Sequence, residues 1–173
     1  FMTSYIPTNG EVNGVTRLQD AAFGAGSSDL INSTEGVLYA EIAALADDLT
    51  LRVISLSDGT TNERVLLMYH SSTNKIRCFI YSGGSFYATL EKVVSNEKDF
   101  HKIAYKYKSG ETKLFVDGLL IGTSTGSFSI TGLDVLQFAN GTPTSSPFYG
   151  KAKCVAVFKE ALTDAELTCL TTI

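Results

Sequence analysis

Hydrophobic and polar residues alternate in short segments along most of the chain, and turn-forming residues separate these segments. The clearest example is residues 101–108, where an isoleucine and two tyrosines fall on one side of an extended chain and Lys102, Lys106 and Lys108 on the other. A period of two is typical of a β-strand with one buried face and one wet face. By the same criterion we expect strands at residues 36–45, 51–57, 64–70, 75–81, 86–90, 101–108, 113–116, 119–123, 132–139 and 151–158.

Turn and cap signals mark where these elements end. Asp117-Gly118 is the strongest hairpin signal, because a tight type I′ turn requires positive φ at both central residues. Helical signal is scarce. The segment Thr163-Asp-Ala-Glu166 fits a capping box, in which the threonine hydroxyl caps the first turn and the glutamate reaches back. It predicts a helix of about two turns over residues 163–170.

Short strands at roughly ten-residue spacing, with glycine-rich turns between them, are typical of a sandwich or jelly roll. The sequence therefore predicts an all-β fold, a two-sheet antiparallel jelly-roll sandwich with one short C-terminal helix. The flexible segment Gly24-Ala-Gly-Ser-Ser28 divides the chain into an N-terminal arm or linker, residues 1–25, and a folded domain, residues 26–173. A chain that begins at Phe1 is expected to be a segment of a longer protein.

Composition and charge exclude several function classes. The net charge of −4 provides no basic field for nucleic acid or an anionic membrane, and no apolar run approaches the roughly 18 residues of a membrane span. The three cysteines, Cys78, Cys154 and Cys169, lack C-x-x-C spacing, and we expect small buried thiols in a chain made in a reducing cytosol. No targeting segment is recognised at the N-terminus.

The hairpin Leu114-Phe-Val-Asp-Gly-Leu-Leu-Ile-Gly122 and the closing segment Val155-Ala-Val-Phe followed by Ala161-Leu-Thr-Asp-Ala-Glu-Leu167 resemble the laminin-G-like branch of the concanavalin A-like lectin/glucanase superfamily. The opening segments Thr3-Ser-Tyr-Ile-Pro-Thr8 and Thr16-Arg-Leu-Gln-Asp20 resemble the arm that introduces such domains in bacteriophage tail, fibre and adhesin proteins. The resemblance implies a jelly roll of roughly twelve to fourteen strands. It also implies that a concave sheet face or its rim loops hold glycan and that some members hold calcium.

The catalytic signature of the superfamily's enzymes is absent from the sequence. Retaining hydrolysis needs two carboxyl groups about 5 Å apart, which alternate residues on one strand can supply. Glu41 stands alone in its strand, and Asp47-Asp48 lies at a turn with side chains facing opposite ways. We expect His101 to serve as a structural hydrogen-bonding residue. No cofactor is indicated with certainty, and calcium stays open because oxygen-bearing residues gather at Asp20, Asp29, Asn32 and Glu35 and at Asp134 and Asn140.

Aromatic and polar residues near strand ends are the candidates for sugar binding, because aromatic rings stack on pyranose faces and polar groups fix orientation. The candidate carbohydrate-binding residues are Tyr69, His70, Arg77, Tyr81, Tyr87 and Tyr149, and Phe86 is a further aromatic residue in this region. The alternative is that these aromatic side chains fill the core or face a neighbouring subunit. The lysines 102, 106, 108 and 113 form a basic stripe, which indicates a solvated sheet face, a guard against edge pairing or a surface that meets anionic polysaccharide.

These observations favour a non-catalytic carbohydrate-binding or adhesion module of a phage-like virion protein, attaching to bacterial surface glycan. Two alternatives stay open: a purely structural spacer or capping domain of a fibre, and an enzyme such as a polysaccharide lyase or glycoside hydrolase. The expected partners are bacterial surface glycan and other domains of the same protein. The resemblance to viral fibres implies a homotrimer displayed on the virion surface after synthesis in the host cytoplasm.

Overall fold

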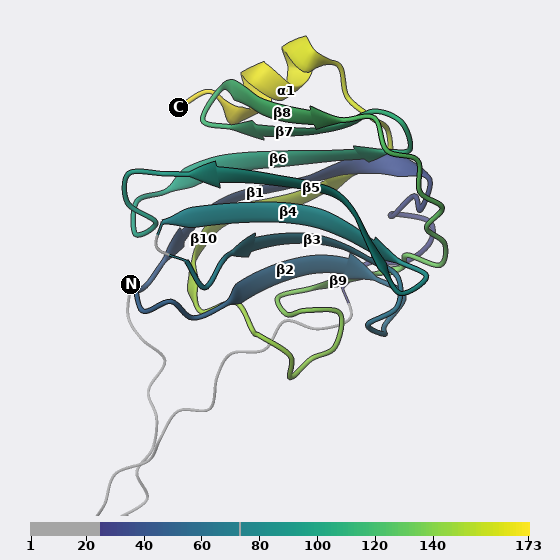
Figure 1. Ribbon diagram of the computed structural model, residues 1–173, viewed down its shortest axis with the longest axis horizontal. Helices are drawn as coiled ribbons and strands as arrows, with labels where there is room; N and C mark the ends of the chain where they lie inside the picture. Colours follow the sequence, from purple (N-terminus) through teal and green to yellow (C-terminus); the bar gives the residue numbers. More distant parts are fainter. Residues whose placement is uncertain (1–24, 73) are drawn as a thin grey trace, which may run out of the picture.

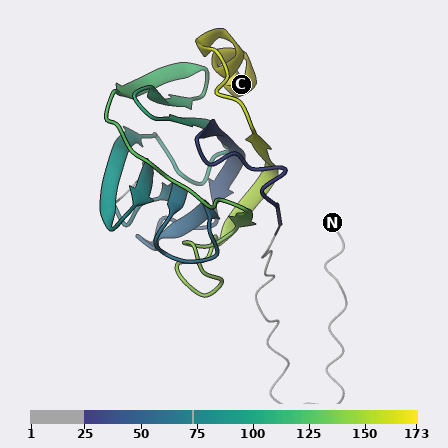
Figure 2. The same cartoon turned by 90° about the vertical axis from the view of Figure 1, so that its right-hand side faces the viewer.

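The computed structural model describes residues 25–72 and 74–173, which form two antiparallel sheets packed face to face (Figures 1 and 2). The β6 sheet has the strand order β10 (Gly150–Phe158), β1 (Glu35–Ala44), β6 (His101–Lys108), β7 (Thr112–Val116) and β8 (Leu119–Ser124). The β3 sheet has the order β5 (Ser85–Val93), β4 (Lys75–Ser82), β3 (Arg64–Tyr69), β2 (Arg52–Ser57) and β9 (Val135–Gln137). The one helix among the described residues, α1 (Asp164–Thr171), follows β10.

This architecture confirms the predicted fold class of a two-sheet antiparallel sandwich with a short C-terminal helix. The described residues contain ten strands, fewer than the twelve to fourteen that the family resemblance implied. Residues 132–139 were expected to be one strand, but only Val135–Gln137 pair with β2. The backbone beyond Gln137 bonds instead to the Ser55 hydroxyl, which donates to the Ala139 carbonyl at 2.6 Å. The predicted arm lies almost wholly outside the described residues.

The core lies between the sheets because alternate residues of each strand point inward. From the β6 sheet it takes the side chains predicted for the buried face of residues 101–108, Ile103, Tyr105 and Tyr107, all without exposed surface. The hairpin between β7 and β8 has φ of 53° at Asp117 and 78° at Gly118, as the type I′ turn requires. The Asp117 carboxylate accepts from a nitrogen of the His101 ring at 2.7 Å, which confirms the structural role expected for that histidine.

Helix α1 covers part of the outer face of the β6 sheet, where Leu167 joins Val37, Tyr39, Ala104 and Phe115 in a second apolar cluster. The wet face that the alternation of residues 101–108 predicts is only partly present: the Lys108 side chain is 45% exposed and Lys102 is half-buried, but Lys106 is not solvated. Lys106 is 4% exposed, and its ammonium donates to Glu111 at 2.8 Å. Of the other three cations of the basic stripe, Lys108 and Lys113 pair with Glu35 and Asp164, and Lys102 donates to the Thr172 carbonyl.

The thiols are only partly as expected. Cys78 is buried in the core, but Cys154 and Cys169 are exposed, which corrects the prediction that all three are buried. Cys154 follows a register shift in the pairing of β10 with β1 and lies on an edge strand, so no further strand covers it. Among the described residues, no helix is long and apolar enough to cross a bilayer.

The capping box at α1 yields a stability prediction. The Thr163 hydroxyl accepts from the Glu166 backbone N–H, and the Glu166 carboxylate accepts from the Thr163 backbone N–H at 2.8 Å. Replacing Thr163 by alanine removes this cap and is expected to lower the free energy of unfolding by about 1 kcal/mol in urea denaturation. Thr168→Ala, at an exposed position of the same helix, is the control and should change stability by less than about 0.5 kcal/mol. Equal losses in both variants would contradict a capping role.

Candidate functional site

The outer face of the β3 sheet, which points away from the β6 sheet, carries a separate cluster of apolar and aromatic side chains. Val53, Leu66, Met68 and Phe79 form its buried centre, with Tyr81 packed beside them. These residues alternate along β2, β3 and β4 with core residues such as Ile54, Leu67 and Ile80. We call this surface, with the charged residues that border it, the outer face.

Strand register sets the order of side chains across the outer face. One row contains Arg64 of β3, Tyr81 of β4 and Phe86 of β5. The Arg64 guanidinium lies over the Tyr81 ring, 4.7 Å from its centroid, and the Phe86 ring meets Tyr81 edge to face at 4.9 Å. Phe79 also packs against Phe86, with ring centroids 5.2 Å apart. The result is a continuous aromatic platform that ends in Phe86, which is 66% exposed.

An irregularity in β5 places Phe86 on this platform. Residues 86 and 91 are an odd number of positions apart, so a regular strand would direct them to opposite faces. The register between β4 and β5 shifts between Cys78 and Ile80, and Ala88 has φ of 48°. A β-bulge of this kind re-aims the side chains beyond it. Tyr105 of the β6 sheet supports the bulge by donating its hydroxyl to the Ala88 carbonyl at 2.6 Å.

A second row carries the charges. Met68 of β3 faces Arg77 of β4, which faces Glu91 of β5. Glu91 accepts hydrogen bonds from Arg77 and from Lys75, the latter at 3.1 Å. Burial acts to raise the pKa of Glu91, but the hydrogen bonds from these two cations together hold it below its usual range. This border of the outer face therefore carries two cations and one ionised carboxylate.

The loop after β9 closes the other border. Gly141 donates its backbone N–H to the Ser55 hydroxyl at 3.0 Å, and the Asn140 amide oxygen accepts from the Arg64 guanidinium. Arg64 forms no ion pair with any residue in ranges 25–72 and 74–173. Burial lowers the pKa of Arg64, and interactions with Tyr81 and Asp58 oppose this shift. A positive charge that has no ion-pair partner among the described residues thus lies against the face of the Tyr81 ring.

The structure brings together three of the six sequence-predicted site residues. Arg77 and Tyr81 project from the outer face of β4, and His70 directly follows β3 at its border. Tyr87 points inward instead, half-buried against the core. Tyr149 is exposed but leads into β10 of the other sheet. For these five residues, glycan binding stays a prediction.

Tyr69 is corrected by the structure. Its ring has no exposed surface and belongs to the core between the sheets, and its hydroxyl donates to the Ile42 carbonyl at 3.0 Å. A ring enclosed in this way has no face to offer to a sugar, since the period of two directs Tyr69 inward and its neighbour His70 outward.

The sequence did not indicate Arg64 and Phe79 as site residues, and it indicated Phe86 only as a further aromatic residue near the candidates. Arg64 and Phe79 stand at alternate positions with Leu66 and Tyr81, which is a recognisable signal once the paired strands are known. Phe86 gives no such signal, because the bulge at Ala88 reverses the face on which it emerges.

His70 carries a prediction about pH. Burial lowers its pKa from 6.5, and the nearby charges of Arg77 and Lys75 lower it further, against an opposing effect of Glu91. A histidine whose pKa is lower in the folded protein than in the unfolded chain destabilises the folded state as the pH drops below the pKa of the unfolded chain. An NMR titration of the His70 ring should give a midpoint below 6.5, and Arg77→Met should move that midpoint upward. A midpoint at or above 6.5 in the unmodified protein would contradict this electrostatic environment.

Two carboxylates away from the outer face lie beside cations. Glu41 pairs with Lys153 at 2.8 Å. Glu97 is 2% exposed and lies 3.9 Å from the Arg52 guanidinium, and burial, followed by the charge of Asp47, raises its pKa. Within the described parts of the chain, no group of three or more His, Cys, Asp or Glu side chains is arranged to hold a metal ion. Of the residues considered for calcium, Glu35 pairs with Lys108, and the Asn32 amide oxygen accepts from Thr34.

Comparisons with known proteins place this geometry in a family. Residues 39–168 match the family model described as the concanavalin A-like lectin/glucanases superfamily. A search of curated protein sequences finds no match.

Among solved structures, the chain is similar to the CBM40 of the Ruminococcus gnavus IT-sialidase bound to α2,3-sialyllactose, with a TM-score of 0.69 and 20% identity over 90% of this chain and 97% of that chain. It is also similar to domain 4 of AbnA, a GH43 arabinanase from Geobacillus stearothermophilus in complex with arabinotriose (TM-score 0.66, 14% identity, 83% of this chain and 69% of that chain). A further similar structure is the LG4-5 pair of the mouse laminin α1 chain (TM-score 0.61, 10% identity, 84% of this chain and 40% of that chain). At these identities the likeness concerns the fold.

Proposed function

Because the chain belongs to the concanavalin A-like lectin/glucanase superfamily, we propose that it is a non-catalytic carbohydrate-binding domain whose outer face holds the glycan. The observation that carries this proposal is the platform of Tyr81 and Phe86, with Phe86 66% exposed beside a buried apolar centre. An aromatic ring exposed beside an ordered apolar cluster provides a surface on which a ligand can pack. Arg77 and His70 stand within the same surface and supply polar contacts that orient a sugar.

The charge distribution supports an acidic sugar as the bound residue. Arg64 lacks an ion pair among the described residues, and Arg77 shares its single carboxylate partner, Glu91, with Lys75. A carboxylate on the ligand would compensate these cations, and Arg presents planar donors suited to that group. The similar R. gnavus and Geobacillus domains hold sialyllactose and arabinotriose respectively, which supports a glycan as the ligand class.

Isothermal titration calorimetry with 3′-sialyllactose and with lactose tests both parts of this proposal. The acidic glycan should bind at least tenfold more tightly than lactose, and Arg77→Met should weaken it by about tenfold. Lys151→Met, which removes an exposed cation from β10 of the other sheet, is the matched control and should leave binding unchanged. Equal affinity for both glycans would reject the acidic-sugar preference, and no effect of Arg77→Met would reject the outer face as the site.

The wider setting that we propose is a longer virion attachment protein, made in the host cytoplasm, which displays this domain as a homotrimer and attaches to bacterial surface glycan. Support comes from the resemblance of residues 3–8 and 16–20 to the arms of phage tail and fibre proteins. A trimer of the 18.6 kDa chain should have about three times that mass in light scattering. A monomer at all concentrations would remove the trimer from the proposal.

A further inference from the structure

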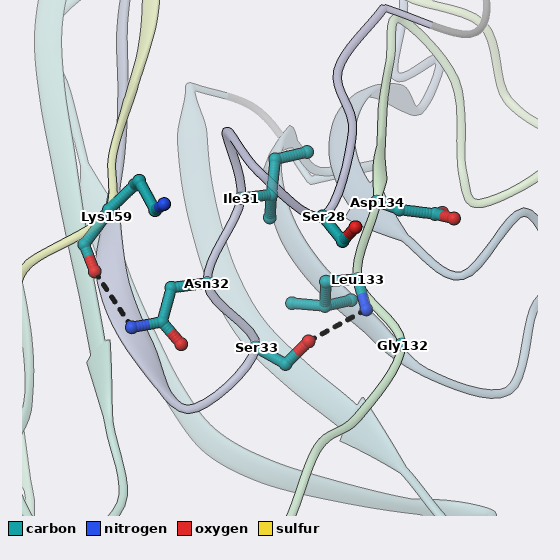
Figure 3. Close-up of a pocket in the computed structure, with 8 residues that line it drawn as sticks. All are labelled: Ser28, Ile31, Asn32, Ser33, Gly132, Leu133, Asp134 and Lys159. Atoms are coloured by element: carbon teal, nitrogen blue, oxygen red, sulfur yellow. Dashed lines mark hydrogen bonds between the residues drawn. The ribbon is translucent and has the colours of Figure 1, made fainter.

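A hollow lies at the end of the sandwich where β1 and β9 begin and β10 ends. Its volume is about 540 Å³, within the range of small-molecule sites. Three separate segments line it: residues 28–33 before β1, residues 132–134 before β9, and Lys159 after β10 (Figure 3). None of these residues belongs to the outer face, so the hollow is a separate surface.

Hydrogen bonds between the three segments hold the walls in place. The Leu133 backbone N–H donates to the Ser33 hydroxyl at 2.9 Å, and the Asn32 amide donates to the Lys159 carbonyl at 3.1 Å (Figure 3). Tyr107 of the core fixes the same segment from below by donating to the Asn32 carbonyl at 2.8 Å. A site whose walls are already ordered loses little conformational entropy on binding.

The floor of the hollow is aliphatic. Ile31 and Leu133 are 3% and 1% exposed and belong to the main core. Polar groups lie on opposite sides of the hollow, with Lys159 and Asn32 on one side and Ser28 on the other (Figure 3). This combination of an apolar floor and separated hydrogen-bonding groups suits a ring that has a C–H face and hydroxyls at its edge.

The hydrogen-bonding capacity of this site is only partly used. The Lys159 ammonium donates to the Asp29 carbonyl at 2.6 Å, which leaves further donors. Among the described residues, neither Lys159 nor Asp134 forms an ion pair. Since the carboxylates of Asp29 and Asp134 stand on the same segments as the hollow, its surroundings carry no excess positive charge. An uncharged ligand is therefore favoured over an anion.

We propose that this hollow is a second binding site, for a neutral monosaccharide-sized polyhydroxylated ring, with Lys159 and Ser28 bonding its hydroxyls above the Ile31–Leu133 floor. The proposal does not depend on what the outer face binds. With both sites filled by residues of one polysaccharide, the second contact would be intramolecular and would raise the overall affinity.

The test uses ¹⁵N-labelled protein titrated separately with D-galactose, D-glucose and N-acetyl-D-glucosamine. At least one of these sugars should cause saturable shifts in the amides of residues 28–33 and 132–134, with a Kd of about 1–10 mM. Lys159→Met should weaken that binding about tenfold, since a charge-assisted hydrogen bond is lost. Tyr81→Ala, on the outer face, should leave binding of the neutral sugar at the hollow unchanged. Loss of binding at the hollow can therefore be distinguished from loss of binding at the outer face.

Absence of saturable shifts at these amides with all three sugars would overturn the proposal, provided that the spectrum stays that of a folded protein. Shifts that are unaltered in Lys159→Met would also overturn it. Tighter binding of N-acetylneuraminic acid than of every neutral sugar at these same residues would contradict the assigned ligand class.

Discussion

Replacing Gly141 by alanine is expected to destabilise the protein by about 3 kcal/mol and to abolish glycan binding at the outer face. Gly141 has φ of 74°, a conformation that costs an L-residue about 1–2 kcal/mol. A Cβ there would lie 2.5 Å from the Thr60 carbonyl oxygen and from Cδ of Arg64, so backbone and guanidinium must both shift. Displacement of Arg64 removes the cation from the face of the Tyr81 ring. Urea denaturation and calorimetric titration measure the two effects.

Gly59 provides a matched control for that variant. It has φ of 80°, but nothing lies within 4 Å of a Cβ built on it. Gly59→Ala therefore introduces the same backbone strain without the collision, and should cost about 1 kcal/mol and leave binding intact. Similar losses of stability and binding in both variants would mean that backbone strain alone, not the contact with Arg64, explains the effect of Gly141→Ala.

Replacing Tyr105 by phenylalanine is expected to cost about 1–3 kcal/mol, since the partly buried Ala88 carbonyl loses its donor. Burial raises the pKa of Tyr105 well above its usual value, so its hydroxyl stays protonated and continues to donate at any ordinary pH. Because the bulge at Ala88 directs Phe86 to the outer face, its loosening should also shift the NMR signals of Phe86 and weaken glycan binding about tenfold.

Tyr69→Phe is the control that separates the loss of stability from the effect on Phe86 and glycan binding. Tyr69 is equally buried and its hydroxyl also donates to a backbone carbonyl, that of Ile42 in β1, which is remote from the bulge. This variant should lose stability to a similar extent while the Phe86 signals and glycan affinity stay those of the unmodified protein. If Tyr105→Phe leaves both of these readouts unchanged as well, the bulge does not depend on the bond from Tyr105.

The strand pattern was predictable because each buried face repeats with a period of two, and β6 begins and ends where its alternation does, at His101 and Lys108. The capping box at Thr163 and the turn at Asp117 were predictable because each depends on a few neighbouring residues. Local patterns do not show what packs against a strand. The alternation predicts that Lys106 is solvated. In the structure it pairs with Glu111, and α1 packs on the neighbouring residues of the sheet.

The candidate site was predictable only where side-chain direction follows from regular alternation. Arg77 and Tyr81 are four residues apart on one regular strand and share a face, as the period requires. Tyr69 and His70 were grouped by proximity in the sequence, although adjacent strand residues point to opposite faces. The direction of the Phe86 side chain depends on a bulge. The position of Arg64 depends on the pairing of β3 with β4 and on Asn140, which lies 76 residues further along the chain. Such long-range pairings have no signature in a single local segment.

A glycan-array comparison of the unmodified protein with Phe86→Ala and Tyr149→Ala, each run with calcium and then with chelator, is the most direct test of glycan binding at the outer face. We predict selective binding of glycans with acidic residues by the unmodified protein and by Tyr149→Ala. Phe86→Ala should lose that binding, because Phe86, unlike Tyr149, belongs to the platform. Retention with chelator would fit the lack of a metal cluster among the described residues, whereas loss would add a metal to the site. Silence of the folded, unmodified protein on a broad array, or full binding by Phe86→Ala, would contradict a glycan site on this surface.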